Sequence, residues 1–135
     1  MAPAPATGVS PEIQAVVDAT NRERARYGLR PLTASPALNR VAQNRSADMA
    51  RRRYFDHTDP DGRDPFWHLR NAGIRYMAGA ENIAMGQRSA AEVVTGWMNS
   101  PGHRANILNG RLGHIGVGLA RDSRGTPYWT QIFTD

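Results

Sequence analysis

The sequence contains no cysteine, no lysine and no long apolar run. The absence of cysteine excludes a disulfide scaffold, a thiol nucleophile and every zinc or iron–sulfur site built on thiolates. No apolar run approaches the roughly 20 residues that cross a bilayer, so we expect no membrane span. The local signatures of zinc proteases, serine hydrolases, P-loops and dinucleotide-binding folds are missing too, which argues against a nucleotide cofactor.

In the absence of lysine, arginine carries all of the positive charge. The 17 basic residues outnumber the 12 acidic ones, and the formal net charge is +5. This excess of positive charge suggests the hypothesis that the protein binds nucleic acid or an anionic surface, because clustered cations attract polyanions. Only Arg51, Arg52 and Arg53 are contiguous, however. We therefore expect solvated helix faces, no specific nucleic-acid partner, and at most weak polyanion binding that disappears at physiological salt.

The length of 135 residues is typical of one domain. Residues 1–9 are rich in alanine and proline and are predicted to form an extended linker, and residues 10–135 form the folded domain. The first residues lack the basic segment and apolar stretch of a secretory signal. If the protein is exported, we expect its signal peptide to be absent from this sequence.

Helix starts are clearly marked. Ser10, Ser35 and Asp64 each precede a proline, the arrangement of a cap followed by a preorganised first helical residue. Ser89 and Glu92 form a capping box, in which each side chain accepts a free amide of the first turn. A short helical turn is expected after Ser100, again as a cap before proline. The predicted helices begin at these five positions, and the first ends near residue 27.

The end of the chain has strand character. Residues 114–120 alternate with period two, and residues 128–133 are rich in aromatic and β-branched side chains, with a turn at residues 122–125. Helices first and strands last predict an α+β domain whose helices pack on a small antiparallel sheet. We expect one core to join the second and fourth helices to this sheet, formed by Val41, Trp97, Met98, Ile115, Val117, Trp129 and Ile132.

Several polar residues lie in segments that look like connections, among them His57, Glu81 and His103, and Glu92 lies at a helix start. Two imidazoles and one or two carboxylates, if they converge, could bind a divalent metal ion, with neutral imidazole as donor. They could equally form a hydrogen-bonded polar cluster. Because tens of residues separate them, local spacing does not decide between the two.

Six ordered motifs resemble those of bacterial CAP, or SCP-like, domains. This superfamily includes cysteine-rich secretory proteins, insect venom antigen 5 and plant pathogenesis-related proteins. The resemblance covers residues from about 10 to 134 and implies a three-layer α-β-α sandwich, export from the cell, and a cleft lined by His and Glu that holds a divalent metal in some members. The motifs are Asn21 to Leu32, Phe55 to Gly62, Glu81 to Ala84, Gly96 to Arg104, Ile115 to Gly118 and Tyr128 to Gln131.

The site residues that the resemblance implies have to be matched one at a time, because the tetrad of eukaryotic members is only partly present here. His57 and Glu81 match the first His and first Glu of the tetrad found in eukaryotic members. The second Glu falls at Ser100 and the second His at Tyr128, so both depart from the pattern. In the bacterial branch His103 looks like the replacement imidazole. The implied cleft is formed by His57, Glu81, Glu92, His103 and Tyr128, with His57 and His103 as ligands of a divalent metal, zinc in the first place.

Two functions follow as expectations, and a third, an arginine-driven binder of nucleic acid or of an anionic envelope polymer, is kept only for completeness. The first is a secreted, extracellular protein, monomeric, whose cleft binds a divalent metal or an extracellular or cell-envelope ligand and which has no catalytic residue. The second is a metal-assisted extracellular hydrolase of peptide or cell-wall substrates, in which Glu81 acts as the base on a bound water. Family resemblance favours the first, because CAP domains as a class have no agreed reaction.

Overall fold

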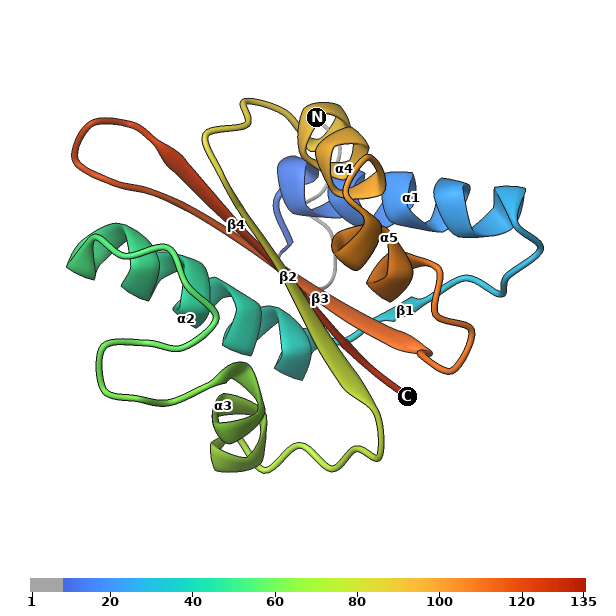
Figure 1. The fold of residues 1–135 in the computed structure, drawn as a ribbon, viewed down its shortest axis with the longest axis horizontal. Coiled ribbons are helices and arrows are strands. Elements are labelled where there is room, and N and C mark those ends of the chain that lie inside the picture. Colours follow the sequence, from blue (N-terminus) through green and yellow to red (C-terminus); the bar gives the residue numbers. More distant parts are fainter. Residues whose placement is uncertain (1–8) are drawn as a thin grey trace.

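The computed structural model describes residues 9–135, so the expected linker lies outside the described residues apart from Val9. In this part of the chain all five helices precede the last two strands, and the other two strands lie between helices along the chain (Figure 1). The elements are α1 (Pro11–Arg26), β1 (Thr33–Ala34), α2 (Pro36–Arg52), α3 (Pro65–Asn71), β2 (Gly79–Met85), α4 (Ala90–Met98), α5 (Pro101–Ile107), β3 (His114–Arg121) and β4 (Pro127–Thr134).

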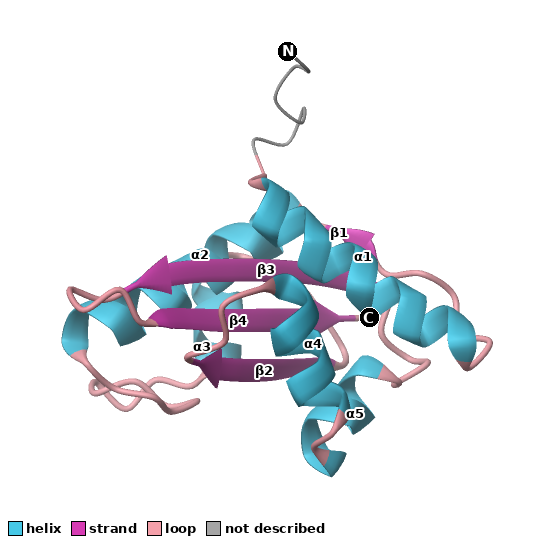
Figure 2. Ribbon diagram, turned by 90° about the horizontal axis from the view of Figure 1, so that it is seen from above, coloured by secondary structure: helices cyan, strands magenta, loops and turns pink. Residues whose placement is uncertain are grey.

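The elements form three layers, with a four-stranded sheet in the middle (Figure 2). Helices α1, α4 and α5 cover one face of the sheet, and α2 and α3 cover the other. The strand order is β1-β3-β4-β2; β3, β4 and β2 are antiparallel, and the two-residue β1 runs parallel to β3. This confirms the expected α-β-α sandwich. Across residues 9–135, no helix is both long and apolar enough to cross a membrane.

The predicted caps start the helices. Ser10, Ser35, Asp64 and Ser89 each accept a hydrogen bond from the backbone amide three residues further on. Ser100 also occupies the cap position of α5, but its side chain makes no capping hydrogen bond. The position was therefore predicted correctly, and the hydrogen bond expected of Ser100 is not formed.

Strand β2 corrects the expectation that the segment around Glu81 is a connection. Residues 79–85 pair with β4 over their whole length, from Gly79 opposite Thr134 to Met85 opposite Tyr128. The segment has one β-branched residue and no aromatic one, so its local strand propensity is low. Its hydrogen bonds to β4 and its buried position, which are set by the tertiary fold, make it a strand.

All seven residues expected in the core are buried, but they do not form one core. Successive side chains of a strand point to opposite faces, so the sheet separates two sets of contacts. Trp129 packs with Trp97, Met98, Ile115 and Val117 in the cluster that includes residues of α1 and α4. Val41 of α2 packs with Ile132 in a separate cluster.

Helix α2 lies against β3 with almost no space between the two backbones. A Cβ atom added to Gly116 would lie 2.2 Å from the carbonyl carbon of Leu38, and one added to Gly118 would lie 2.4 Å from that of Ala42. Real Cβ atoms do not approach other atoms so closely. The two glycines thus allow the close packing of α2 on the sheet.

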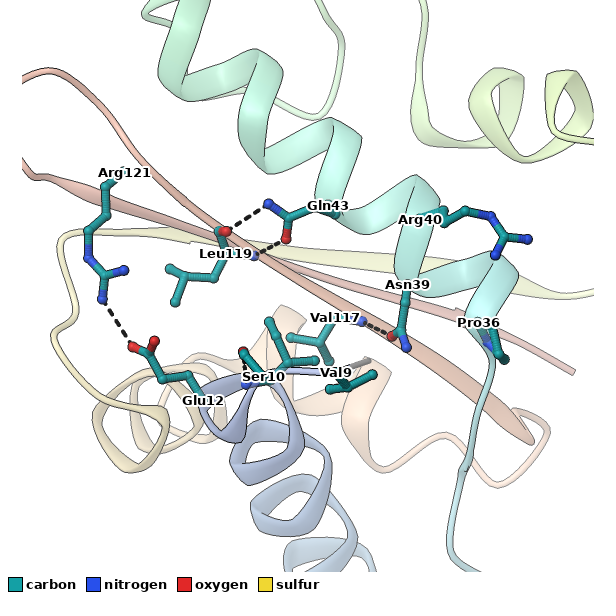
Figure 3. A pocket seen from close by; sticks show the side chains of 11 residues that line it. Val9, Ser10, Glu12, Pro36, Asn39, Arg40, Gln43, Val117, Leu119 and Arg121 are labelled. Atoms are coloured by element: carbon teal, nitrogen blue, oxygen red, sulfur yellow. Dashed lines mark hydrogen bonds and ion pairs between the residues drawn. The ribbon is translucent and has the colours of Figure 1, made fainter. Parts of the chain in front are cut away.

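Beyond the two residues of β1, side chains of α2 form hydrogen bonds with the edge of β3 (Figure 3). The side-chain oxygen of Asn39 accepts the Val117 amide at 3.0 Å. The Gln43 side chain accepts the Leu119 amide at 3.0 Å and donates to the Leu119 carbonyl at 2.8 Å. These bonds satisfy backbone groups that a neighbouring strand would otherwise use.

Candidate functional site

The candidate site lies at β2, which forms one edge of the sheet. Glu81 and Asn82 are consecutive in this strand, so their side chains point to opposite faces. Glu81 reaches α2 and the loop that carries His57, and Asn82 reaches α5, which carries His103. The edge strand thereby brings together two segments that are distant in the sequence.

Glu81 is buried and held by two partners. One oxygen of its carboxylate accepts the Arg45 Nε at 3.1 Å, and the other accepts His57 Nδ1 at 2.7 Å. Only 2% of the Glu81 side chain and 2% of the Arg45 side chain are exposed. The carboxylate is therefore a charged group inside the protein, and its neutralisation depends on Arg45.

Arg45 also positions the loop of His57. Its Nη2 donates to the backbone carbonyls of Asp56 and His57, each at 2.9 Å, and its Nη1 donates to the Tyr54 hydroxyl at 2.9 Å. Burial alone would lower the pKa of the guanidinium, but the neighbouring Glu81 and Tyr54 outweigh burial and raise it. One buried cation thus holds the carboxylate and the histidine loop together.

His57 is oriented by Glu81 and remains accessible. About half of its side chain, 52%, is exposed. The hydrogen bond to Glu81 raises the pKa of His57, and burial opposes this effect only in part. In the neutral ring, Nδ1 carries the proton that Glu81 accepts, so the lone pair lies on Nε2. The ring nitrogen away from Glu81 is thus the one available to a ligand.

On the other face, Asn82 is the centre of a buried amide network. Its Nδ2 donates to the backbone carbonyl of His103 at 3.1 Å and to Gln131 Oε1 at 3.0 Å, and its Oδ1 accepts Asn106 Nδ2 at 2.8 Å. These bonds fix the start of α5 against β2. His103 is therefore held through its backbone, and its ring is left free of that network.

His103 lies near His57. Burial lowers the pKa of His103, and the positive charge of protonated His57 lowers it further. His103 is therefore biased toward the neutral form, in which imidazole can bind a metal ion. The charge of His57 thus acts on His103 from the other side of the edge strand.

The structure does not bring Glu92 and Tyr128 into this group. The Glu92 carboxylate accepts the Arg88 amide at 2.9 Å at the start of α4, a capping role. Tyr128 is paired with Met85, four residues along β2 from Glu81, and its hydroxyl donates to Asp122 at 3.3 Å. At about 3.3 Å per residue, Tyr128 lies near the other end of the strand.

The residues that converge suit a site with few protein ligands. The described part of the chain contains no group of three or more His, Cys, Asp or Glu residues able to hold a metal ion. His57 and His103 could supply two nitrogen donors, and the remaining positions of a bound ion would be open. The site could then hold an ion together with an outside ligand, but it is not a closed structural zinc site.

Sequence reasoning did not single out Arg45 or the roles of Asn82 and Asn106. A signal for Arg45 was present, because the buried stripe of α2 includes Leu38, Ala42 and Met49, and position 45 falls on the same face. An arginine on an apolar stripe requires a buried partner, which is Glu81. The amide network had no such signal, since it joins three separate elements.

A hollow of about 510 Å3 lies at the opposite edge of the sheet (Figure 3). Val117 and Leu119 of β3, Ile13 of α1 and the two amide side chains of α2 are among its lining residues. His57, Glu81 and His103 do not line it, so this hollow is separate from the candidate site.

Comparison with known proteins gives one family. The family model described as "Cysteine-rich secretory protein family" (CAP) matches residues 17–133. The uncharacterized protein YkwD of Bacillus subtilis (strain 168) is 45% identical over 127 residues, which are 94% of this chain and 48% of YkwD. The chain thus spans about half the length of this relative.

Solved structures share the fold. An extracellular protein containing an SCP domain from Bacillus anthracis matches with a TM-score of 0.85 and 29% identity, over 93% of this chain and 44% of that protein. NaASP2, whose crystal structure was determined with Zn2+, matches with a TM-score of 0.68 and 14% identity, over 97% of this chain and 83% of NaASP2. At that identity, the second likeness concerns the fold alone.

Proposed function

Because the chain belongs to the cysteine-rich secretory protein (CAP) family, we propose that it acts outside the cell as a binding protein. In this proposal His57 and His103 hold a divalent metal ion, zinc in the first place, and the ion accepts an extracellular ligand. The observation that carries it is the hydrogen bond of 2.7 Å between His57 Nδ1 and Glu81, which leaves Nε2 of His57 available to an ion.

The surroundings of His57 support this role. Metal-binding histidines commonly donate their second ring nitrogen to a carboxylate, which fixes the ring and increases the basicity of the ligand nitrogen. Glu81 is the carboxylate, and Arg45 holds Glu81 in place. Glu81 is then a positioning residue for His57 and does not touch the ion.

The relatives support two parts of the proposal, the location outside the cell and the choice of zinc. The Bacillus anthracis protein, which is 29% identical to this chain, is extracellular, and a member of the same fold, NaASP2, has a crystal structure with Zn2+. A bound zinc ion would supply a Lewis acid that polarises an oxygen or nitrogen of the incoming ligand. The chain itself would supply the two imidazoles and the fixed orientation of His57.

Hydrolysis is the weaker alternative. It needs Glu81 as a general base, and a base must reach the proton that it accepts. Here the carboxylate is 2% exposed and already accepts hydrogen bonds from Arg45 and His57. This arrangement favours a binding role for the site over the hydrolase reaction.

The test is the thermal unfolding of the full chain with increasing zinc at neutral pH. A ligand that binds only the folded state raises the melting temperature by mass action. We expect zinc to raise it for the wild type, and His57→Ala and His103→Ala each to abolish the rise. Protons compete with the metal, so the rise should weaken as pH falls through the raised pKa of His57.

His114→Ala is the matched control, because His114 is also exposed but lies in β3 and contacts the carbonyl of Asp135. This variant should retain the zinc response of the wild type. The metal proposal fails if zinc does not stabilise the wild type, or if His114→Ala loses as much of the response as the other two variants.

A further inference from the structure

Arginines that are scattered in the sequence gather around the turn between β3 and β4. This hairpin projects from one end of the sheet, beside the end of α2 and the loop that precedes α4 (Figure 1). A hollow of about 400 Å3 on it is lined by Arg88, Arg121 and Arg124, together with Gly86 and residues of the turn. Positive side chains from two separate loops and a strand thus face one space.

Two further hollows adjoin the first. One of about 180 Å3 shares Arg124 with it and adds Arg53, and another of about 380 Å3 shares Arg53 and Arg121 and adds Arg51. The three hollows share lining residues and therefore lie next to one another around the hairpin. We call the surface formed by Arg51, Arg53, Arg88, Arg121 and Arg124 the hairpin surface.

Much of this positive charge is not neutralised by the protein. Arg121 pairs with Glu12 and Arg51 pairs with Asp48, each at 3.0 Å. Within residues 9–135, no carboxylate forms an ion pair with Arg53, Arg88 or Arg124.

Asp122 is the acidic residue that lines two of these hollows. Its carboxylate accepts the amides of Arg124 and Thr126 and the Tyr128 hydroxyl. Asp122 also interacts electrostatically with Arg124, but the five arginines of the hairpin surface outnumber the three carboxylates that interact with their guanidinium groups, those of Glu12, Asp48 and Asp122.

The backbone of Arg53 gives an independent indication. Arg53 caps the end of α2 with a φ of 59°, in the left-handed region where glycine or asparagine is usual. An ordinary side chain is strained in this conformation. Among residues 9–135, the hydrogen-bond partner of the guanidinium is the Ser123 hydroxyl, at 3.4 Å. An arginine at a position that suits glycine is explained if its side chain binds something outside the protein.

We propose that the hairpin surface binds a linear phosphodiester polymer of the polyol-phosphate class through its phosphate groups. Guanidinium forks match phosphate oxygens, and three neighbouring hollows around one hairpin offer separate positions for phosphates of one chain. The aromatic residue that lines a hollow, Tyr128, is buried, so bases would find no ring on which to stack. This favours a polymer without bases over a nucleic acid.

The proposal does not depend on the metal site. It uses none of the residues around His57, and only the extracellular origin of the polymer rests on the proposed location of the protein. Zinc has no part in the binding test, so either proposal can fail alone.

The test measures binding of fluorescently labelled poly(glycerol phosphate) by anisotropy at an ionic strength of about 0.05 M, where screening is weak. The variant Arg53→Gln, Arg88→Gln, Arg124→Gln should lose at least about tenfold in affinity. Three lost phosphate contacts should also reduce the slope of log affinity against log salt by about 2.

The matched control is Arg22→Gln, Arg70→Gln, Arg75→Gln, which removes the same charge from exposed arginines that line none of the three hollows. It should stay within about twofold of the wild type, since binding is local. Equal losses in both variants would mean that net charge alone drives binding. That result, or no binding by the wild type, overturns the proposal.

Two further measurements decide the polymer and the role of Arg53. Oligodeoxythymidine of equal charge should bind no more tightly than poly(glycerol phosphate), and tighter binding by more than about tenfold would make nucleic acid the partner and overturn the proposal. Arg53→Gly should raise the melting temperature by relieving strain and still weaken polymer binding. Unchanged affinity in this variant would refute the role of Arg53.

Discussion

Arg45 and Glu81 together form a buried ion pair that links helix α2, the edge strand and the loop of His57. Such a pair contributes little net stability compared with an apolar pair of similar volume, but each partner depends on the other. Loss of the cation leaves a carboxylate in a position that water does not reach. Arg45 therefore matters for the order of the site and for the stability of the fold.

We expect Arg45→Met to lower the free energy of unfolding by about 3 to 5 kcal/mol, because Glu81 is left buried without its partner. The double variant Arg45→Met, Glu81→Leu should be clearly more stable than Arg45→Met alone. Urea unfolding followed by circular dichroism measures both. If the double variant is no more stable than the single one, the cost comes from lost packing of Arg45 and not from the unpaired charge.

Asp48, which accepts the Tyr54 hydroxyl, makes the stability of the fold depend on pH. Its carboxylate accepts Nε and Nη2 of Arg52 at 2.8 and 2.9 Å and the Tyr54 hydroxyl at 2.6 Å. The Arg52 hydrogen bonds in the first place, and the Tyr54 hydroxyl in addition, lower the pKa of Asp48 to about 2. A lowered carboxylate pKa stabilises the fold above the unfolded pKa and loses this effect as pH falls toward the folded pKa.

We expect Asp48→Asn to cost about 2 kcal/mol at neutral pH, since the side chain is only 20% exposed. The difference from the wild type should shrink as pH falls from about 4 through 2, because both proteins carry a neutral side chain only below the folded pKa of Asp48. Urea titrations at a series of pH values measure this. A difference that does not change with pH would show that packing, not charge, is responsible.

At the scale of the residue, sequence patterns found the histidines and Glu81 but not what holds them. The motifs around His57 and His103 indicated both rings, whereas their separation in the sequence gave no distance between them. Hydrogen bonds such as that of Asn82 to the His103 carbonyl exist only once β2 and α5 are side by side. No local pattern encodes such a contact.

At the scale of the element, the contact of α2 with β3 depends on two residues without side chains. Gly118 has Ala42 backbone atoms within 2.4 Å of its would-be Cβ, whereas Gly96 in α4 has open space at the same position. The same substitution should therefore have opposite effects at the two sites.

We expect Gly118→Ala to destabilise the protein by several kcal/mol, above the roughly 1 to 3 kcal/mol of ordinary overpacking, because backbone and not a flexible side chain obstructs the methyl group. Gly96→Ala should be neutral or stabilising by up to about 1 kcal/mol, because alanine is the better helix former. Differential scanning calorimetry of both variants is sufficient. A mild effect at Gly118 would mean that α2 can move away from the sheet.

Elements with their own local signal were predicted from the sequence, and elements without one were not. Four of the helices follow a side-chain cap that hydrogen-bonds as expected, and the β3–β4 hairpin follows its alternating pattern. Strand β1 has two residues and β2 has little strand propensity, so both depend on neighbours that are distant in the sequence.

At the scale of the whole molecule, the sheet divides the interior, and Trp129 is the largest side chain of β4 on the α1 and α4 side. It is fully buried, and its ring nitrogen donates to the Gln87 carbonyl at 2.9 Å. We expect Trp129→Ala to cost about 3 to 5 kcal/mol in denaturant unfolding. A cost below about 1 kcal/mol would contradict the packing described for this face.

The hydrogen bonds from Asn39 and Gln43 of α2 to the edge of β3 also affect whether two copies of the chain can join. An unpaired strand edge is a template on which a second chain can add a strand, and repeated addition leads to fibres. Asn39 already occupies the amide of Val117, and Gln43 occupies the amide and the carbonyl of Leu119, which such an addition would need. The helix thus protects this stretch of the β3 edge against the addition of a strand from a second copy.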